Sequence, residues 1–504
     1  MALVYKLSYF CQFGAISCVS VLLPVFLQSI GLTEEKIGIL CSLRPYLMSL
    51  ASPMWSAIAD TFHLHAFILL SSIVLSAAVR FFYLTTTSFP ALVLWFSLAS
   101  VFDSAISPIF DTFAMNQLND VTDWGKIRLW GAIGFGLSSL GAGFIVTQTT
   151  LEWAGVFILY WFLMALTFFS MVNVVARGNR NNGSAAVVQA TDEGGEEAGP
   201  NNKYHQKSRE NDDGKEILVN ENGRDQSSYD MRPLESLEPT VEKNSHRNHT
   251  CSESDDQRMS MPAPAPHGES AGLSGDWALD ITSSEKDNNN MDSNKAAGQW
   301  KEMIQLCCSS ELLSFFCVIL VGGMSAGVID TFLYLHLRSL GGSALLCGAA
   351  RAVTCAAEVP VFQLADRLLR RAGEEGAIAL ALAVYVARLG CYAGLHRLGR
   401  PALVLPAEAL HGFTFAALWA ASTSYAYRVA PPRLRTTMQG LVTGIHWGVG
   451  FGSGALAGGW AYRRRGAVWL FQAQAALVGA VLALYLPLLL LRRRRRRSPP
   501  AGGG

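Results

Sequence analysis

Two carboxylates, Asp103 and Asp111, interrupt an apolar stretch of the chain, and an arginine, Arg128, stands at the start of the next one. A charge at bilayer depth is costly, and membrane proteins keep such charges mainly where they face a cavity or a partner of opposite sign. The two acids are eight residues apart, about 80° around a helix axis, so one broad helix face can carry both. We therefore take Asp103, Asp111 and Arg128 as candidate substrate-binding residues. The alternative is a structural ion pair between two helices.

A second set of charges lies in the apolar stretches after residue 300. Glu408 and His411 are three residues apart and share one helix face, where a carboxylate and an imidazole can exchange a proton or bind a cation together. Arg388 is a further candidate for substrate binding, and Asp330 and Glu358 join Glu408 and His411 as candidates for proton coupling. Acids, arginines and a histidine inside a membrane are typical of a proton-coupled substrate site. Each residue taken alone also fits a role in helix packing.

Two patterns with metal-binding or catalytic precedents are discounted. Glu408 and His411 have the Glu-x-x-His spacing of di-iron bundles, but those bundles need two copies and the chain has one. Gly323-Met-Ser325-Ala-Gly327 fits a hydrolase motif, but that motif works on a strand-to-helix turn and here it lies within an apolar stretch. We expect no metal, no cofactor and no enzymatic activity.

The composition indicates a membrane protein with many spans. Of the 504 residues, 50% are hydrophobic and only 16% are charged, a balance that suits a polytopic membrane protein better than soluble domains. Uncharged runs at residues 129–151, 153–176 and 467–491 reach the roughly 20 residues that a bilayer core requires. The formal net charge of +1 gives no indication of nucleic-acid binding. The lipid bilayer is therefore the expected environment.

The apolar stretches form two blocks of six, which predicts an all-α membrane protein with twelve transmembrane helices in two bundles. The first six helices are expected at about residues 5–30, 36–59, 65–86, 89–117, 127–148 and 153–176. The second six are expected at about residues 307–337, 343–366, 376–396, 401–428, 435–461 and 467–491.

Residues 180–300 separate the two blocks and are rich in Asn, Ser, Asp, Glu, Gly and Pro. Too little apolar surface is present there to offset chain entropy, so we expect a disordered linker. The expected division is a first bundle over 1–179, the linker over 180–300, a second bundle over 301–491 and a basic tail over 492–504.

A weak internal repeat relates the two blocks and makes them pseudo-symmetric. Glycine, arginine, proline and acidic positions recur in the same order: Gly31, Gly38, Arg44, Pro53 and Asp60 in the first block, and Gly341, Gly348, Arg351, Pro360 and Asp366 in the second. Duplicated six-helix halves with a site at their interface are a transporter architecture.

The basic residues favour a cytoplasmic position for both termini and for the linker. In that orientation the inner loops and the tail carry Lys126, Arg128, Arg177, Arg180, Arg367, Arg370, Arg371, Arg428, Arg433, Arg435 and the run from Arg492 to Arg497. The outer loops are poorer in basic residues, although Arg397, Arg400 and residues 463–465 reduce the contrast. Arg44 and Arg80 are weaker candidates for a functional role, because extension of the Arg80 side chain toward the outer interface is an alternative.

Several of these stretches resemble the major facilitator superfamily. Gly125-Lys-Ile-Arg128-Leu-Trp-Gly131 is similar to the fifth-helix start of the lactose-permease-like branch, whose arginine grips substrate hydroxyl groups together with a fourth-helix acid, here at Asp111. Arg388-Leu-Gly resembles the ninth-helix arginine of that branch. Phe135 stands where those permeases keep a substrate-stacking tryptophan.

The tenth and eleventh helices resemble the group named major facilitator superfamily domain-containing protein six. The matching stretches are Pro406-Ala-Glu408-Ala-Leu-His411-Gly-Phe-Thr-Phe and Ala430-Pro-Pro-Arg433-Leu-Arg-Thr-Thr-Met-Gln439-Gly. In the permeases the histidine precedes the acid on helix ten, whereas here the order is reversed.

These residues and the resemblance lead to one hypothesis: a secondary transporter that moves a small polar solute by alternating access, coupled to protons. A non-transporting membrane receptor or scaffold on the same fold is the alternative. The alternative predicts that neutralising Glu408 or Arg128 leaves activity intact, while deletion of the linker abolishes it.

Overall fold

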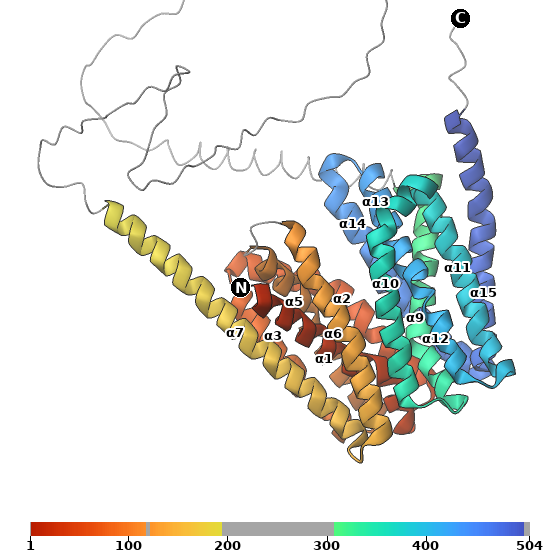
Figure 1. The fold of residues 1–504 in the computed structure, drawn as a ribbon, viewed down its shortest axis with the longest axis horizontal. Helices are drawn as coiled ribbons and strands as arrows, with labels where there is room; N and C mark the ends of the chain where they lie inside the picture. Colours follow the sequence, from red (N-terminus) through yellow and green to blue (C-terminus); the bar gives the residue numbers. More distant parts are fainter. Residues whose placement is uncertain (1, 117–120, 194–306, 498–504) are drawn as a thin grey trace, which may run out of the picture. The chain divides into compact units, whose positions relative to one another are not determined.

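The computed structural model describes residues 2–116, 121–193 and 307–497, and every regular element in these ranges is a helix (Figure 1). The first half contains α1 (Ala2–Ser29), α2 (Glu34–Phe62), α3 (His65–Val79), α4 (Phe81–Thr85), α5 (Phe89–Asn116), α6 (Val121–Gln148) and α7 (Glu152–Glu193). The second half begins with α9 (Ser310–Ser339), α10 (Ala344–Ala372) and α11 (Glu374–Leu398). It continues with η1 (Pro401–Leu403), α12 (Val404–Glu408), η2 (Gly412–Ala417), α13 (Leu418–Val429), η3 (Pro432–Leu434), α14 (Arg435–Thr443), η4 (Gly444–Gly450) and α15 (Phe451–Arg497).

Ten helical stretches among the described residues are long and apolar enough to cross a membrane. The last stretch, Arg435–Leu491, has 57 residues and contains non-helical backbone at Gly466 (φ 81°), so it consists of two spans. Helix α2 is 29 residues long and carries several charges, and it is not one of the ten. With α2 included and the last stretch divided at Gly466, the described residues contain the twelve helices that the sequence predicts. The expected all-α membrane fold is confirmed.

Helices distant in the sequence pack together both within and between the two halves of the chain. In Figure 1, α1 to α7 gather in one bundle and α9 to α15 in a second. Helix α6 packs on α1 and α5 packs on α2 and α3, while α15 packs on α9 and α11. Between the halves, α6 contacts α10 and α2 contacts α15. The two halves form one compact unit.

The internal repeat corresponds to two equivalent turns. Gly31 follows α1 with φ 86° and Gly341 follows α9 with φ 82°, a left-handed conformation that glycine adopts without a steric penalty. After the second turn, Ser343 caps α10 by accepting a hydrogen bond from the Leu346 amide at 3.1 Å. The glycines in the repeat therefore fix where α2 and α10 begin.

Two further glycines of the repeat, Gly38 on α2 and Gly348 on α10, bring the halves into backbone contact. A Cβ atom at Gly38 would lie 2.6 Å from the Ala455 carbonyl oxygen, and one at Gly348 would lie 2.3 Å from the Ser139 carbonyl oxygen. Both contacts lie in the first half of their helix, close to the Gly31 and Gly341 turns. The halves therefore meet at the end of the molecule that carries these turns.

Three polar contacts between the halves accompany these glycines. They are the hydrogen bonds from Leu345 N to Thr147 Oγ1 (3.0 Å) and from Ser139 Oγ to the Gly348 carbonyl oxygen (3.3 Å), and the ion pair between Arg463 and Glu34 (3.9 Å). The closest contacts of this interface are thus between neutral groups.

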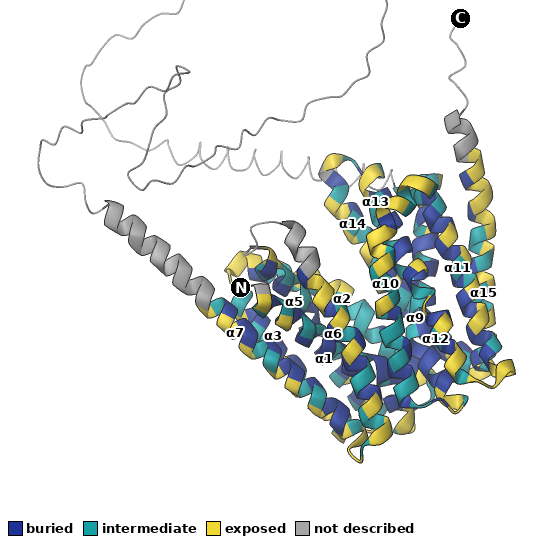
Figure 2. Cartoon of the chain, in the orientation of Figure 1, coloured by how far each residue is buried: buried dark blue, intermediate teal, exposed yellow. Residues whose placement is uncertain are grey.

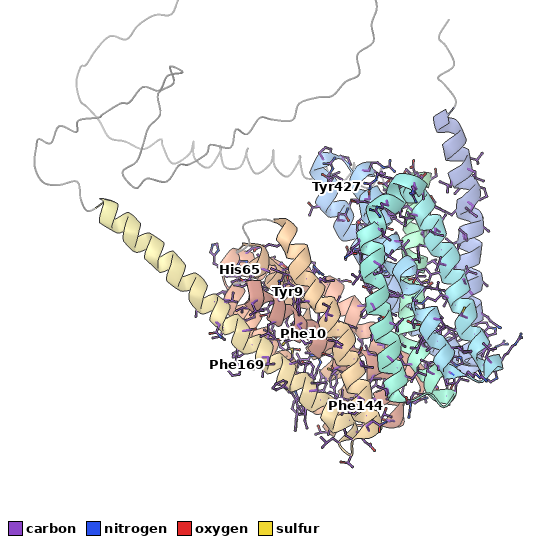
Figure 3. All side chains as sticks on the ribbon, in the orientation of Figure 1. Tyr9, Phe10, His65, Phe144, Phe169 and Tyr427 are labelled. Atoms are coloured by element: carbon purple, nitrogen blue, oxygen red, sulfur yellow. The ribbon has the colours of Figure 1, made fainter. Side chains whose placement is uncertain are left out.

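The distribution of exposed residues suits a bilayer. Buried residues fill the inside of each bundle, and exposed residues follow the outer faces (Figure 2). Phe144 on α6 and Phe169 on α7 point away from the neighbouring helices (Figure 3) and are 52% and 64% exposed. Large apolar side chains on such a face match surrounding acyl chains rather than water. The chain is a multi-pass membrane protein.

Two helices extend beyond the expected bundle boundaries. Helix α7 continues past residue 180 to Glu193, and α15 continues past residue 491 to Arg497. The remainder of the predicted linker from residue 194 and of the predicted basic tail from residue 498 lies outside the described residues. The expected division of the chain therefore stays a prediction.

We predict that Gly348→Val separates the two halves at this end, because the added side chain would overlap the Ser139 backbone. Gly390→Val on α11 is the control, since nothing lies within 4 Å of a Cβ atom at Gly390. Spin labels at Thr150 and Ser339, in a cysteine-depleted background, report the separation by pulsed electron paramagnetic resonance. Longer distances are expected for Gly348→Val alone. Equal distances in both variants would show that the glycine contact does not hold this end closed.

Candidate functional site

The first-half pair predicted from the sequence is present. Arg128 on α6 donates from Nη1 to Asp111 Oδ2 on α5 at 3.1 Å. Tyr9 on α1 donates its hydroxyl to the other oxygen of the same carboxylate at 2.5 Å. The side chains of Arg128 and Asp111 are 46% and 24% exposed, so neither charge is sealed inside the protein. A pair of this kind is weakly held and can exchange partners.

Asp103 has different partners from Asp111. Its two carboxylate oxygens accept from the two terminal nitrogens of Arg80, which stands between α3 and α4, and the hydroxyls of Ser76 and Tyr160 complete the network. The side chains of Arg80 and Asp103 are each 8% exposed. Of the two alternatives for Arg80, extension toward the outer interface is wrong, because a buried carboxylate holds its guanidinium inside the bundle. Asp103 as a substrate-binding residue stays a prediction.

Two of the second-half candidates, Glu408 and His411, meet around one guanidinium, that of Arg388 on α11. Arg388 donates from Nη2 to Glu408 Oε2 at 2.8 Å, and from Nη1 to Thr414 Oγ1 at 2.9 Å and to His411 Nδ1 at 2.8 Å. The Tyr392 hydroxyl donates to the other oxygen of Glu408. Glu408 and His411 are therefore bridged by Arg388, whereas the sequence suggested direct exchange between them. The side chains of Arg388 and Glu408 are only 2% and 1% exposed.

His411 connects this buried network to a more accessible carboxylate. Its Nε2 lies 2.9 Å from Glu358 Oε1 on α10, and the two side chains are 14% and 21% exposed. A guanidinium only donates hydrogen bonds, so His411 Nδ1 must accept from Arg388 and carry no proton. The ring proton is then on Nε2 and is donated to Glu358. The geometry thus defines a neutral His411 in one tautomer.

Asp330 lies in a third pair, on α9 and α10. Arg351 donates from Nη2 to Asp330 Oδ1 at 2.7 Å and from Nε to the Tyr334 hydroxyl at 3.0 Å. Its guanidinium carbon also lies 5.8 Å from the centre of the Phe135 ring, which belongs to the first half. Arg351 therefore faces both halves of the molecule.

The pairs fall into two kinds by exposure. Arg80 with Asp103 and Arg388 with Glu408 are sealed, and each carboxylate there is neutralised by a guanidinium. The pairs that keep part of their surface accessible are Arg128 with Asp111, Arg351 with Asp330, and His411 with Glu358. Of the carboxylates in these five pairs, Glu358 is the one paired with an imidazole rather than with a guanidinium.

Sequence reasoning missed the hydroxyl groups that complete these networks. Tyr392 stands four residues after Arg388, and Tyr334 stands four residues after Asp330. A tyrosine one helical turn from a charged residue in a membrane helix is a sequence signal, and it would have identified both Tyr392 and Tyr334. Tyr9 has no such signal, because its partner lies about a hundred residues away in the chain.

Two discounted patterns have structural explanations. Ser325 is fully buried within α9, where its hydroxyl donates to the Val321 carbonyl oxygen at 2.8 Å and accepts from Gln474 Nε2 at 2.9 Å. In the part of the chain that the structure describes, no three His, Cys, Asp or Glu side chains gather as a metal site requires.

The twelve helices and their paired internal charges define a multi-pass membrane protein with the major facilitator fold. Solved structures of this fold align along almost the whole chain. The nucleoside transporter NupG aligns with a TM-score of 0.64 at 12% identity, over 97% of this chain and 98% of that one. The D-xylose-proton symporter aligns with a TM-score of 0.54 at 13% identity, over 95% of each chain.

The sequence pattern of the MFS_1 like family matches residues 2–473, and the chain belongs to this family. It is 33% identical over 144 residues to the maltose permease of Geobacillus stearothermophilus, covering 28% of this chain and 36% of the permease. It is 28% identical over 168 residues to the human major facilitator superfamily domain-containing protein 6-like, covering 33% of this chain and 28% of that protein. The chain thus spans about a third of these relatives' length. The family expected from the sequence is confirmed.

We predict that Arg80→Leu lowers the free energy of unfolding by about 3–5 kcal/mol, because it leaves Asp103 as an unpaired buried charge. The double variant Arg80→Leu with Asp103→Leu is expected to recover most of this loss. The measurement is unfolding in mixed micelles titrated with sodium dodecyl sulfate.

The control for this prediction is Asp60→Asn. Asp60 pairs with His65 at 2.8 Å but is 75% exposed, so its loss should cost no more than roughly 1 kcal/mol. A similar loss for Asp60→Asn and Arg80→Leu would contradict the role assigned to the sealed pair.

Proposed function

We propose that the protein is a secondary active transporter that moves a small polar solute across a membrane by alternating access, coupled to protons. Membership of the MFS_1 like family supports transport, as do the permease, nucleoside transporter and proton symporter to which the chain is similar. The observation that carries the proposal is Glu358, a carboxylate inside the second half whose bonded partner is a neutral histidine.

Glu358 is the proposed proton carrier. His411 can donate one hydrogen bond to the carboxylate but cannot neutralise it, because Arg388 occupies the other ring nitrogen. A charged Glu358 is acceptable while it is partly accessible, and becomes costly when the site closes. Protonation therefore precedes closure, and this requirement links the proton to the conformational change. His411, Arg388 and Glu408 position the carboxylate, and Asp330 with Arg351 forms a neighbouring pair.

The solute is proposed to bind between the halves. Asp111 and Arg128 present an acceptor and a donor on the first half, and their pair is exposed enough to open when a solute supplies replacement hydrogen bonds. Arg388 contributes from the second half through the network that contains His411. Asp103 supports this site from its sealed pair.

The contacts at Gly38 and Gly348 are proposed to be one of two gates. They close the end of the molecule that carries the Gly31 and Gly341 turns. Transport then requires this end to separate while the opposite ends of the two halves approach. Rocking of one six-helix half against the other achieves both movements.

We predict that Glu358→Gln abolishes accumulation driven by a pH gradient and retains solute exchange at equal pH. The isosteric amide binds no proton, yet it still accepts the hydrogen bond from His411. The test uses proteoliposomes and a solute that raises the melting temperature of the wild type, but not of Arg128→Ala, in a screen of sugars, nucleosides and amino acids.

Glu35→Gln, an exposed position at the start of α2, is the matched control and should behave as the wild type. Unchanged pH-driven accumulation by Glu358→Gln would refute the proton-carrier role. Absence of any uptake by the wild type would favour the receptor or scaffold alternative.

Both termini and the linker are proposed to be cytoplasmic, on the basis of the basic inner loops. Asn182-Gly-Ser and Asn248-His-Thr are glycosylation sequons in the linker. We predict that neither acquires a glycan in a eukaryotic membrane, whereas a sequon inserted after Gly31 does. An endoglycosidase mobility shift measures both, and a glycan on Asn248 would invert the orientation.

A further inference from the structure

Four aromatic rings on neighbouring segments of the second half form a continuous surface, here called the aromatic shelf: Phe415, Trp419, Trp447 and Phe451. The centre of the Trp447 ring lies 5.7 Å from that of Phe415, 6.2 Å from Trp419 and 6.0 Å from Phe451. Trp447 is 36% exposed and the other three are partly exposed. The shelf therefore offers ring faces to a ligand, which a fully packed core would not do.

The shelf begins next to His411, which contacts the proposed proton carrier Glu358. The His411 ring stacks on Phe415 with 5.5 Å between centres and 21° between planes, and Phe415 continues the stack to Trp419 at 6.4 Å and 24°. These three rings stand four residues apart on successive helical turns. A ligand on the shelf thus lies beside the imidazole that contacts Glu358.

The two segments that carry Phe415 and Trp447 pack on helices of both halves. Trp447 precedes Gly448, where a Cβ atom would lie 2.4 Å from the Ser49 hydroxyl oxygen on α2. Phe415 lies 6.1 Å from Phe362 on α10. Phe415 therefore packs against α10, and the segment that carries Trp447 packs against α2 of the first half.

Both sides of the shelf are built on π-helical segments. Phe415 lies within η2 (Gly412–Ala417) and Trp447 within η4 (Gly444–Gly450). Single π-helical turns inside α-helices are uncommon and occur frequently at functional sites. Two of them facing each other at the same rings indicate a local arrangement that ordinary helix packing does not require.

A buried hydrogen-bond acceptor lies against the shelf. His446 is 2% exposed, and its ring centre lies 5.5 Å from Trp419 and 5.0 Å from Trp447. Its Nδ1 lies 3.2 Å from the Ile319 carbonyl oxygen, which only accepts, so Nδ1 carries the proton and Nε2 is an acceptor. His446 Nε2 has no hydrogen-bond partner among the described residues. Such a group is costly in a folded protein unless a protein group, a water molecule or a ligand donates to it.

From the shelf and this acceptor, we infer that the solute carries a flat aromatic or heteroaromatic ring with an N–H or O–H donor. The ring of the solute stacks on Phe415 and on a rotated Trp447, and this rotation of Trp447, the most exposed ring of the shelf, exposes His446 Nε2 to the donor. The polar remainder of the solute then reaches Glu358 and Arg128 across the site. This inference rests on the proposed transport function and specifies its substrate class.

The test measures binding of paired probes to the full-length protein in lipid nanodiscs by isothermal titration calorimetry. Uracil and 5,6-dihydrouracil share their N–H groups but differ in flatness. Indole and 1-methylindole, and benzimidazole and 1-methylbenzimidazole, share their flat rings but differ in the N–H donor. Uracil is expected to bind the wild type roughly tenfold more tightly than 5,6-dihydrouracil. Indole and benzimidazole are expected to bind roughly tenfold more tightly than their 1-methyl counterparts.

Trp447→Leu is expected to weaken binding of the flat probes roughly tenfold. Trp460→Leu, a tryptophan 49% exposed on α15, is the matched control and should leave binding unchanged. His446→Phe keeps a flat ring but removes Nε2, so it should abolish the preference for indole over 1-methylindole. Thermal unfolding of each variant establishes that it is folded.

The outcomes separate this inference from the proposed function. Equal binding within every pair, or equal loss in Trp447→Leu and Trp460→Leu, overturns the ring inference even if transport of another solute is found. Preferential binding of the flat probes without uptake into proteoliposomes supports the ring site and overturns transport.

Discussion

The pairing of charges inside the helical bundles is the constraint on which the rest of the structure depends. An unpaired guanidinium or carboxylate at membrane depth costs several kcal/mol, so Arg80 must reach Asp103 and Arg388 must reach Glu408. These contacts fix how α3 is rotated against α5 and how α11 is rotated against α12. Within that fixed frame, the Glu358 side chain is 21% exposed, compared with 8% for Asp103 and 1% for Glu408.

The architecture and one charged pair, Arg128 with Asp111, could be predicted from the sequence, because charges stand out in apolar stretches. The twelve helices follow from run lengths, and Arg128 with Asp111 follows from their positions on consecutive helices. The partner of Asp103 could not be predicted in this way. Asp103 lies eight residues before Asp111 on the same helix, so the two side chains are roughly 12 Å apart along the helix axis. This distance along the axis, rather than the shared helix face, determines which residue Asp103 can reach. Arg80, 23 residues away, lies at the right depth.

The relative placement of Glu408 and His411 could not be predicted from the sequence for a different reason. Helical periodicity puts Glu408 and His411 on one face, but α12 ends at Glu408 and a π-helical segment begins at Gly412. That segment packs tightly on α10, where a Cβ atom at Gly412 would lie 2.5 Å from the Ala357 carbonyl oxygen. A π-helical turn is uncommon, and a close contact with another helix is not visible in a local sequence pattern. A local pattern therefore cannot place Arg388 between the two side chains.

The glycine contacts between the halves have a consequence for how the closed end responds to its surroundings. Dispersion and neutral hydrogen bonds hold Gly38 and Gly348 in place, and the ion pair at this interface, Arg463 with Glu34, spans 3.9 Å. Dispersion falls steeply over the first ångström of separation, whereas attraction between ions extends over a Debye length of about 8 Å at physiological salt. The closed end should therefore release abruptly once parted, and its equilibrium should be nearly indifferent to ionic strength.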